Sequence, residues 1–291
     1  PLAGFIKQKY PKARISFLVR DYTKNIAADH PYIDEVIVLI QNDGKTGFFE
    51  NLSIIKSKKF DTCIIVRPIF IPSLLVFLSR IKNRIGTGYR WYSFLFNKKV
   101  YEHRKDAQHH ELEYNLNLLS KIGIENNVDE KNVRYDLTVH KSSLSIVNKV
   151  LIDNHIDPTK HFIIVHPGSG GSSMDLTADK FSQLVKLLID DGHQVIITGN
   201  KTEHALCETV KADSSSVNLA GRFNLDELTA LISLAFMFIS NSTGPIHIAA
   251  ALNKYVVGFY PKVVSCSKER WGPYTIKKLI YEPSIECKDC T

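Results

Sequence analysis

Short β-rich apolar runs alternate with helical patterns along the whole chain, and this alternation limits the possible folds more than any other feature. Runs typical of strands occur at residues 14–19, 35–40, 61–66, 161–166, 193–199, 236–240 and 255–260. Between them apolar residues recur at helical spacing, as in Phe181, Leu184, Val185 and Leu188. Strands joined by helices form parallel sheets covered on both faces, so we expect an α/β fold.

A polar helix predicted over residues 142–160 ends in Asp157-Pro158 and separates two such series. We therefore expect two α/β domains, at residues 1–157 and 158–291. The chain of 291 residues with 44% hydrophobic composition can fill two cores of ordinary size. Two α/β domains in series place a binding cleft between them, beyond the carboxyl ends of the strands.

The net charge of +7 is unevenly distributed. Residues 1–150 hold 24 Lys and Arg against 15 Asp and Glu, whereas residues 151–291 hold 13 against 15. Basic and aromatic residues are interleaved in residues 51–100, where Asp61 is the single acid. This pattern indicates nucleic acid, an anionic membrane surface or an ordinary solvated face. Because aromatic RNP-type signatures and paired Cys/His fingers are absent from the sequence, we expect an anionic lipid or acceptor and no nucleic acid.

Cysteine use and hydropathy indicate the compartment. The five cysteines are an odd number, which argues against a disulfide framework and favours the reducing cytoplasm. Cys287 and Cys290 form a C-x-x-C pair without a second pair, so we predict no metal site. No apolar run reaches the roughly 18 to 20 residues of a membrane-spanning helix, and residues 1–15 lack the layout of a secretory signal.

The first of three unusual strand-to-helix loops reads "HPGSGGSSMDLTADKF" and precedes a helix predicted from about Ala178. Its glycines permit close backbone approach and its serines add hydrogen-bond donors, which together suit a phosphate. The loop matches neither the G-x-x-x-x-G-K-[ST] nor the G-x-G-x-x-G pattern, so hydrolytic nucleotide use and a dinucleotide fingerprint are not predicted. A plain Gly-rich connection remains the alternative.

The second loop, "ITGNKTEHAL", places Gly199 at a strand end and Glu203 one turn into the next helix. A carboxylate there suits ribose hydroxyls, or it simply complements the helix dipole. The third loop lies in "FMFISNSTGPIHIAAAL", where a hydroxyl before Gly-Pro predicts a capped helix start near Gly244. His247 then falls in the first turn, beside amides that suit an anion, although a packed histidine is the alternative.

These motifs together resemble glycosyltransferase family 9, the heptosyltransferases of lipopolysaccharide core assembly. "HPGSGGS", "ITGNKTE", "NLAGRFNLDELTALISLA" and "ISNSTGPIHIAAAL" occur in the family's order and spacing, and "HHELEYNLNLLSKIGI" fits the first half. The resemblance implies a GT-B architecture, with two Rossmann-like domains whose parallel sheets face a central cleft. It also implies that the second domain binds the nucleotide-sugar donor and the first binds the acceptor, without a metal or other cofactor.

Carried over position by position, the resemblance implies a donor site in the second half. Its residues are Gly168, Ser169, Gly170, Ser172, Met174, Gly199, Glu203, Leu219, Phe223, Ser242, Thr243, Gly244 and His247. The serines, the glycine backbone and the opening of the helix at residue 244 would meet the diphosphate. Glu203 would contact the ribose, Leu219 and Phe223 would line the base, and His247 would support the phosphate-binding turn.

The chain also departs from the family. Members often have Asp at the position of Ser242 and a cation near the position of Met174. In this chain Lys201, Arg222 or Lys262 would have to supply that positive charge. The family's first strand, with the Gly-Asp loop that carries its proposed general base, and its closing helix are not found. We therefore expect a fragment of a longer protein, and no catalytic residue is assigned.

The resemblance implies an inverting transferase that moves a heptose-like sugar, with ADP-heptose as the usual donor, onto a lipopolysaccharide-core or related anionic glycolipid acceptor. We expect a cytoplasmic enzyme that is peripheral at the inner face of the membrane. Because of Ser242 and Met174, a different nucleotide sugar or a non-catalytic nucleotide-sugar-binding or assembly protein remains an alternative. A sugar-nucleotide epimerase shares the fold and is a third possibility.

Overall fold

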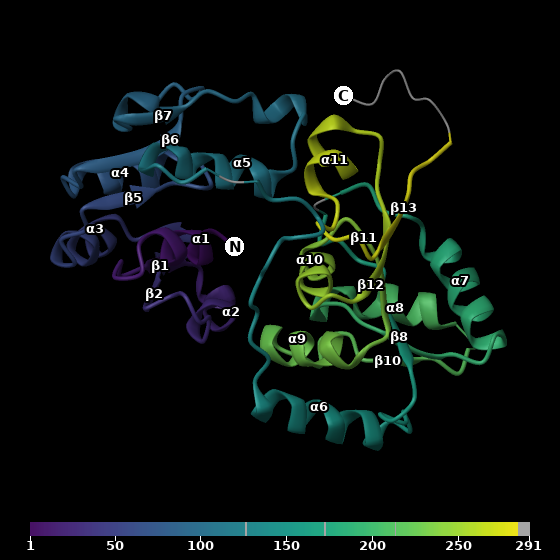
Figure 1. The fold of residues 1–291 in the computed structure, drawn as a ribbon. Helices are drawn as coiled ribbons and strands as arrows, with labels where there is room; N and C mark the ends of the chain where they lie inside the picture. Colours follow the sequence, from purple (N-terminus) through teal and green to yellow (C-terminus); the bar gives the residue numbers. More distant parts are fainter. Residues whose placement is uncertain (126, 172, 213, 285–291) are drawn as a thin grey trace. The chain divides into compact units, whose positions relative to one another are not determined.

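The structure, a computed structural model, describes residues 1–125, 127–171, 173–212 and 214–284. It divides into two compact units, Pro1–Asp129 and Glu130–Thr291 (Figure 1). Strands and helices alternate along both units, as the sequence predicts. Each unit is described separately below.

The first unit contains short strands and short helices. Its strands are β1 (Ser16–Val19), β2 (Glu35–Val38), β3 (Gln41–Asn42), β4 (Lys45–Thr46), β5 (Thr62–Ile64), β6 (Asn83–Thr87) and β7 (Lys98–Val100). Its α-helices are α1 (Leu2–Lys9), α2 (Lys24–Ala28), α3 (Phe48–Ser57), α4 (Phe70–Leu78) and α5 (Glu111–Asn117). Its 3-10 turns are η1 (Asp21–Thr23), η2 (Ser93–Leu95), η3 (Arg104–Asp106) and η4 (Leu118–Ile122).

The strands of the first unit form parallel pairs and one small hairpin. β1 pairs with β2, and β5, β6 and β7 form a second parallel sheet in that order, while β3 and β4 are antiparallel. Helices α3 and α4 bury Ile55, Leu75 and Val76 in one apolar cluster, and Leu116 and Leu119 centre another. In the second sheet the parallel strands start at one edge, where β6 begins at Asn83, and end at the opposite, carboxyl edge, where β6 ends at Thr87.

The second unit is built on longer and more fully buried strands. These are β8 (Phe162–His166), β9 (Gln194–Ile197), β10 (Val217–Asn218), β11 (Met237–Asn241), β12 (Tyr255–Phe259) and β13 (Lys278–Tyr281). The α-helices are α6 (Lys141–Asp153), α7 (Ala178–Asp190), α8 (His204–Lys211), α9 (Leu225–Leu234), α10 (Gly244–Ala251) and α11 (Lys268–Trp271), with 3-10 turns η5 (Lys201–Glu203) and η6 (Val264–Cys266).

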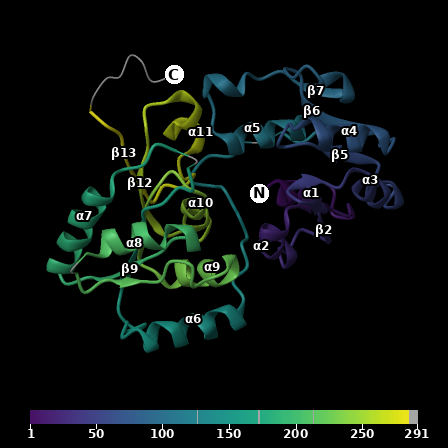
Figure 2. The same ribbon diagram turned by 180° about the vertical axis from the view of Figure 1, so that it is seen from behind.

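These six strands form one parallel sheet in the order β10-β9-β8-β11-β12-β13. Successive side chains of β8 point to opposite faces, so Ile163 and Val165 join the cluster under α7 and α8, while Phe162 and Ile164 join the cluster under α6, α9 and α10. Apolar residues on both faces explain the continuous runs in the sequence. Figure 2 shows the helical layers from behind.

The division between the units falls at Asp129, before the expected boundary at residue 157. The reason is that α6 belongs to the second unit, where Val147 and Leu151 are fully buried in its core beside α9 (Figures 1 and 2). The preceding segment is tied there as well, because the Tyr135 hydroxyl donates to the Tyr274 carbonyl at 2.9 Å. The outer face of α6 is polar, and for this reason the sequence suggested a connection between two domains.

The predicted strands are all present, and each end lies within two residues of its predicted position. The helix starts predicted near Ala178 and Gly244 are confirmed at those residues. Among the described residues, no helix is long and apolar enough to span a bilayer.

Candidate functional site

The strand order of the second unit brings two of the unusual loops together. The chain moves outward from β8 to β9 and β10, then returns to β11 on the other side of β8. Ser240 of β11 is paired with His166 of β8, so the loops that follow these strands leave the same edge side by side. Ligands of open parallel sheets bind at such a switch point, beyond the carboxyl ends of the strands.

The loop after β8 uses its glycines in two different ways. Gly170 and Gly171 have φ angles of +59° and +78°, which only glycine adopts without strain, and no atom lies within 4 Å of where their side chains would be. Gly168 has no such freedom, because a side chain there would collide with the carboxylate of Glu203. The backbone of residues 170–171 is therefore open to a ligand, while that of residue 168 faces the next loop.

Asn241 fixes this loop against the end of β11. Its side chain is fully buried, its Nδ2 donates to the Pro167 carbonyl at 2.6 Å, and its Oδ1 accepts from the Leu176 amide at 2.9 Å. The two bonds hold both ends of the loop, so the glycines between them lie at a defined position beside α10. We did not predict a role for Asn241, because its partners are 65 and 74 residues away in the sequence.

Glu203 connects the second loop to the first. Its Oε1 accepts a hydrogen bond from the Gly170 amide at 3.0 Å, and its Oε2 accepts one from the Asn200 amide at 2.8 Å, completing a capping box. Gly199 leaves room for this side chain, since a Cβ there would lie 3.2 Å from the Glu203 Cβ. The contacts seen are thus to backbone amides, and ribose binding by Glu203 stays a prediction.

The third loop opens α10 without a side-chain cap. Thr243 is extended, with φ −145° and ψ 163°, and makes no capping hydrogen bond, so the expected hydroxyl cap was wrong. Pro245 in the first turn carries no N–H, and the other amides that open an α-helix lack partners within the helix. Gly244 is exposed and has open space around its Cα. This helix start therefore presents donors and partial positive charge to an anion.

Ser242 and His247 flank that helix start. His247 is the fourth residue of α10, as predicted, and its side chain is half-buried. Ser242 forms a side-chain hydrogen bond with Tyr260, whose hydroxyl also donates to the Trp271 carbonyl at 2.9 Å. Burial raises the pKa of Tyr260, so its phenol stays protonated and able to donate. Ser242 thus links the end of β11 to the end of β12.

Two titratable residues at this edge were not predicted. His166, at the end of β8, is buried with its Nδ1 2.9 Å from the Thr198 Oγ1, and burial lowers its pKa to about 4 despite the nearby charge of Glu203. Asp175 accepts a hydrogen bond from the Ser169 hydroxyl at 3.0 Å. Burial and then the Glu203 charge raise the pKa of Asp175. The end of β8 and the loop after it therefore hold a neutral histidine and a carboxyl group beside the glycines.

The remaining predicted residues lie at the same edge with different exposure. Leu219 is 6% exposed and follows β10, while Phe223 is half-buried against the core, so little of Leu219 is left for a nucleotide base. Met174 is 67% exposed. Ser172 lies outside the described residues, whereas the Ser173 hydroxyl is buried and has no hydrogen-bond partner among them.

Exposed cations follow three strands of this sheet at the same edge. Lys201 is in η5 after β9, Arg222 follows β10, and Lys262 follows β12. Each is a candidate for the missing phosphate-binding cation. No group of three His, Cys, Asp or Glu side chains that suits a metal occurs in the described part of the chain. Cys287 and Cys290 lie outside that part.

Comparison with known proteins identifies the family of the chain. The model of glycosyltransferase family 9 (heptosyltransferase) matches residues 52–291. The lipopolysaccharide heptosyltransferase 3 of Escherichia coli K12 is 26% identical over 288 residues, which cover 94% of this chain and 80% of that protein.

Two solved structures share the fold. The glycosyl transferase family 9 structure from Veillonella parvula has a TM-score of 0.85 at 16% identity and covers 97% of this chain and 80% of its own. The ADP-heptose lipopolysaccharide heptosyltransferase II of E. coli has a TM-score of 0.79 at 21% identity, with 96% and 84% covered. At such identities the likeness bears on the fold alone, and it confirms the expected GT-B class.

Proposed function

Because this chain belongs to glycosyltransferase family 9 and is a glycosyltransferase, we propose that it transfers a heptose-like sugar from a nucleoside diphosphate donor to a lipopolysaccharide-core or related anionic glycolipid. ADP-heptose is the first donor to test, since a structural relative carries that name. Family membership favours transfer over the non-catalytic and epimerase alternatives.

One observation carries the donor proposal: the uncapped start of α10 lies beside an open, glycine-lined loop at the switch point of the second sheet. Both elements supply backbone donors, and a diphosphate is the part of a nucleotide sugar that needs them. We assign the diphosphate to the Gly171 backbone and the amides that open α10, while the Gly170 amide, which already donates to Glu203, would hold the loop in place. Ser169 already donates to Asp175, so it would support this loop from within.

The proposed reaction is a single displacement. An acceptor hydroxyl oxygen attacks the anomeric carbon, the bond from that carbon to the diphosphate oxygen breaks, and the hydroxyl proton passes to a base. Negative charge grows on the departing diphosphate, where the dipole of α10 and a cation such as Lys262 would stabilise it. We therefore propose inverting transfer that needs no metal; the base is not assigned to a described residue.

The acceptor and the location are proposed from charge. The first unit carries the excess of basic residues, which suits a phosphorylated or carboxylated glycolipid. We propose that this unit binds the acceptor and that the enzyme works as a cytoplasmic protein at the inner membrane surface.

Calorimetric titration of the full chain with ADP, UDP, GDP and CMP, and then with their sugars, tests the donor proposal. We expect selective micromolar binding of one nucleoside diphosphate, undiminished by EDTA. A transfer assay with the matching sugar and a lipopolysaccharide-core acceptor follows. Failure to bind any of these nucleotides would overturn the assignment of the diphosphate to this edge, and loss of transfer in EDTA would overturn metal independence.

A further inference from the structure

A forty-residue stretch of the first unit contains cations and apolar residues but no acid. Residues 62–101 hold Arg67, Arg80, Lys82, Arg84, Arg90, Lys98 and Lys99, and no Asp or Glu. Within this stretch α4 (Phe70–Leu78) carries no charge at all. None of these residues has a role in the donor site, which lies in the other unit.

Residues of β6 and of the segment that follows it contact the two ends of one face of α4. Phe70 and Phe77 are seven residues apart and share that face. The Trp91 ring lies 4.8 Å from the Phe70 ring, and the Arg84 guanidinium lies 5.3 Å from the Phe77 ring. Between them Tyr92 and Leu95 pack against the helix. The segment over residues 91–95 therefore runs along α4.

Large apolar side chains on these two elements remain in solvent. Trp91 is 74% exposed and Phe94 is 64% exposed, and the side chains of Ile69, Phe77 and Leu78 are each more than a third exposed. The neighbours Tyr92 and Leu95 are buried, so the segment is folded and turns only Trp91 and Phe94 outward. Exposed aromatic and aliphatic groups of this size on a folded surface mark an interaction site.

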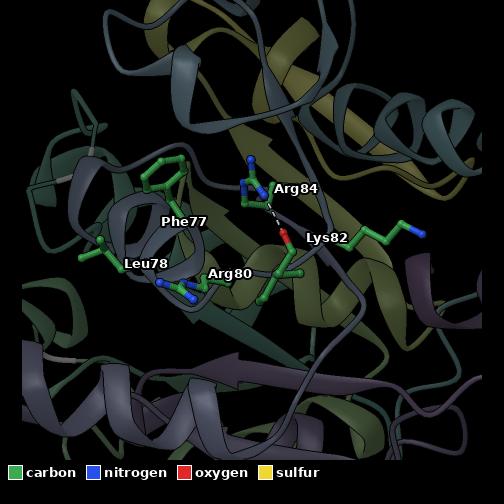
Figure 3. Close-up of a pocket in the computed structure, with 6 residues that line it drawn as sticks. Phe77, Leu78, Arg80, Lys82 and Arg84 are labelled. Atoms are coloured by element: carbon green, nitrogen blue, oxygen red, sulfur yellow. Dashed lines mark hydrogen bonds between the residues drawn. The ribbon is translucent and has the colours of Figure 1, made fainter.

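A pocket adjoins the carboxyl end of α4 (Figure 3). It encloses about 350 Å³ between Phe77, Leu78, Arg80, Ile81, Lys82 and Arg84. Arg84 is fixed, because its Nε donates to the Leu95 carbonyl at 2.8 Å and its Nη1 to the Ile81 carbonyl at 2.5 Å. Arg80 and Lys82 are exposed. An anionic group with an apolar tail would therefore find cations and an apolar wall together.

This pocket does not belong to the substrate edge of its own sheet. It lies where the chain enters β6 at Asn83, at the amino-terminal edge, whereas substrates of parallel sheets bind beyond the carboxyl ends. A ligand bound in this pocket would therefore be distinct from the acceptor sugar.

We infer that α4 and residues 91–94, with the pocket of Arg80 and Lys82, form the surface that binds anionic phospholipids of a membrane. Phe77, Leu78, Trp91 and Phe94 would enter the headgroup region, while the cations meet lipid phosphates. Trp side chains favour this interfacial depth. Aliphatic Leu78 and Ile69 suit acyl chains and offer nothing to nucleic-acid bases. The inference rests on the proposed membrane location and names the residues responsible.

Trp91 reports on this surface directly, since the chain has two tryptophans and Trp271→Phe leaves Trp91 alone. The full-length Trp271→Phe chain is mixed with vesicles of phosphatidylglycerol, or of phosphatidylcholine, that hold no glycolipid. We expect a blue shift of Trp91 emission and quenching by brominated lipid with the anionic vesicles only, reversed by salt. Unchanged emission in the presence of phosphatidylglycerol would overturn the inference.

A charge-matched pair of double variants tests the cations. Arg80→Glu with Lys82→Glu should weaken co-sedimentation with phosphatidylglycerol vesicles by about thirtyfold or more. Lys149→Glu with Lys186→Glu, at exposed positions of the second unit, changes the net charge equally and should bind nearly as the wild type does. Equal weakening in both pairs would overturn the inference, as would binding of single-stranded RNA in place of vesicles.

Nucleotide titration of the same variants separates this inference from the proposed function. Arg80→Glu with Lys82→Glu should bind the nucleoside diphosphate with wild-type affinity. Vesicle binding without any nucleotide binding would overturn the donor assignment alone, and nucleotide binding without vesicle binding would overturn the membrane surface alone.

Discussion

The Glu203 carboxylate accepts a hydrogen bond from the Gly170 amide at 3.0 Å, and this bond connects the loop after β9 to the glycine-rich loop after β8. The same side chain caps its own helix through the Asn200 amide. Each carboxylate oxygen of Glu203 thus holds one of the two loops. The side chain lies beside Gly168, and any larger residue at position 168 would displace it.

Glu203→Ala should therefore cost more than the loss of a helix cap. We expect about 1–3 kcal/mol of unfolding free energy and about tenfold weaker nucleotide binding, because two hydrogen bonds to a charged group are lost and the 168–171 loop is released. Urea unfolding and calorimetry measure the two effects.

Glu227 supplies the matched control. It closes a capping box with the Asn224 amide at 2.9 Å, as Glu203 does with Asn200, but no other loop is known to depend on it. Glu227→Ala should cost about 0.5–1 kcal/mol and leave nucleotide affinity unchanged. Equal effects of the two variants would mean that the bond to Gly170 stabilises nothing.

Features that depend on their own local sequence could be predicted, whereas features that depend on residues far apart in the sequence could not. Strands β8, β11 and β12 were predicted because both faces are buried, which gives continuous apolar runs. β6 was not predicted, because Asn83, Arg84 and Thr87 interrupt its pattern and its stability comes from pairing with β5 and β7. Local side-chain preference is a weak guide where tertiary pairing decides.

The site shows the same division. The glycines and the helix start at Gly244 were evident from local backbone requirements. Asn241 was overlooked because an asparagine after a strand reads as a turn residue until its distant partners are known. The missing cap at Thr243 could not be foreseen either, since a threonine before a helix normally provides one.

Asn241→Asp should be strongly destabilising. The substitution replaces the Nδ2 donor to the Pro167 carbonyl with an oxygen and puts a carboxyl group in a fully buried position. We expect a loss of about 2–4 kcal/mol, together with weaker nucleotide binding, because the glycine loop is held by this side chain. Asn224→Asp is the control: there Oδ1 alone accepts, from two exposed amides, so aspartate should be tolerated. A stable Asn241→Asp protein would contradict the clamp.

His166 should make the second unit less stable in acid. Burial lowers its pKa from 6.5 to about 4, so between these values the unfolded chain binds more protons than the folded one. Unfolding free energy then falls as pH drops from about 6.5 towards 4, by up to about 3 kcal/mol. The raised pKa of Asp175 opposes this in part, because a folded state that takes up a proton early gains stability.

Urea unfolding of wild type and His166→Gln at pH 7.5 and 4.5 isolates the histidine. The variant should lose less stability between these pH values than the wild type, and its Thr198 contact should be kept by the amide. His161→Gln, at an exposed histidine stacked on Phe236, should retain the wild-type pH dependence. Parallel curves for wild type and His166→Gln would show that the pKa of His166 is the same in the folded and unfolded protein.

His247→Ala should weaken nucleoside diphosphate binding by about tenfold or more while leaving the protein folded. His247 is in the first turn of α10 and half-buried, so its removal alters the support of the amides that open this helix. Calorimetry with the nucleotide found in the panel measures the loss. Unchanged affinity in a folded His247→Ala protein would remove His247 from the site.

Gly244→Val tests the helix start itself. Gly244 has a negative φ and no atom within 4 Å of a built Cβ, so valine should fit the unliganded protein and cost little stability. The same open space is where we assign the diphosphate, and a branched side chain there would push the phosphate away from the amides of α10. We expect affinity for the nucleoside diphosphate to fall at least about tenfold, with a smaller loss for the nucleoside, which has no phosphate to displace.

Gln183→Val, on the exposed surface of α7, introduces the same side chain and should change neither affinity. Equal losses for nucleoside and nucleoside diphosphate would mean that the valine disturbs the base or ribose contacts, and the diphosphate would then have to be assigned to another part of this edge.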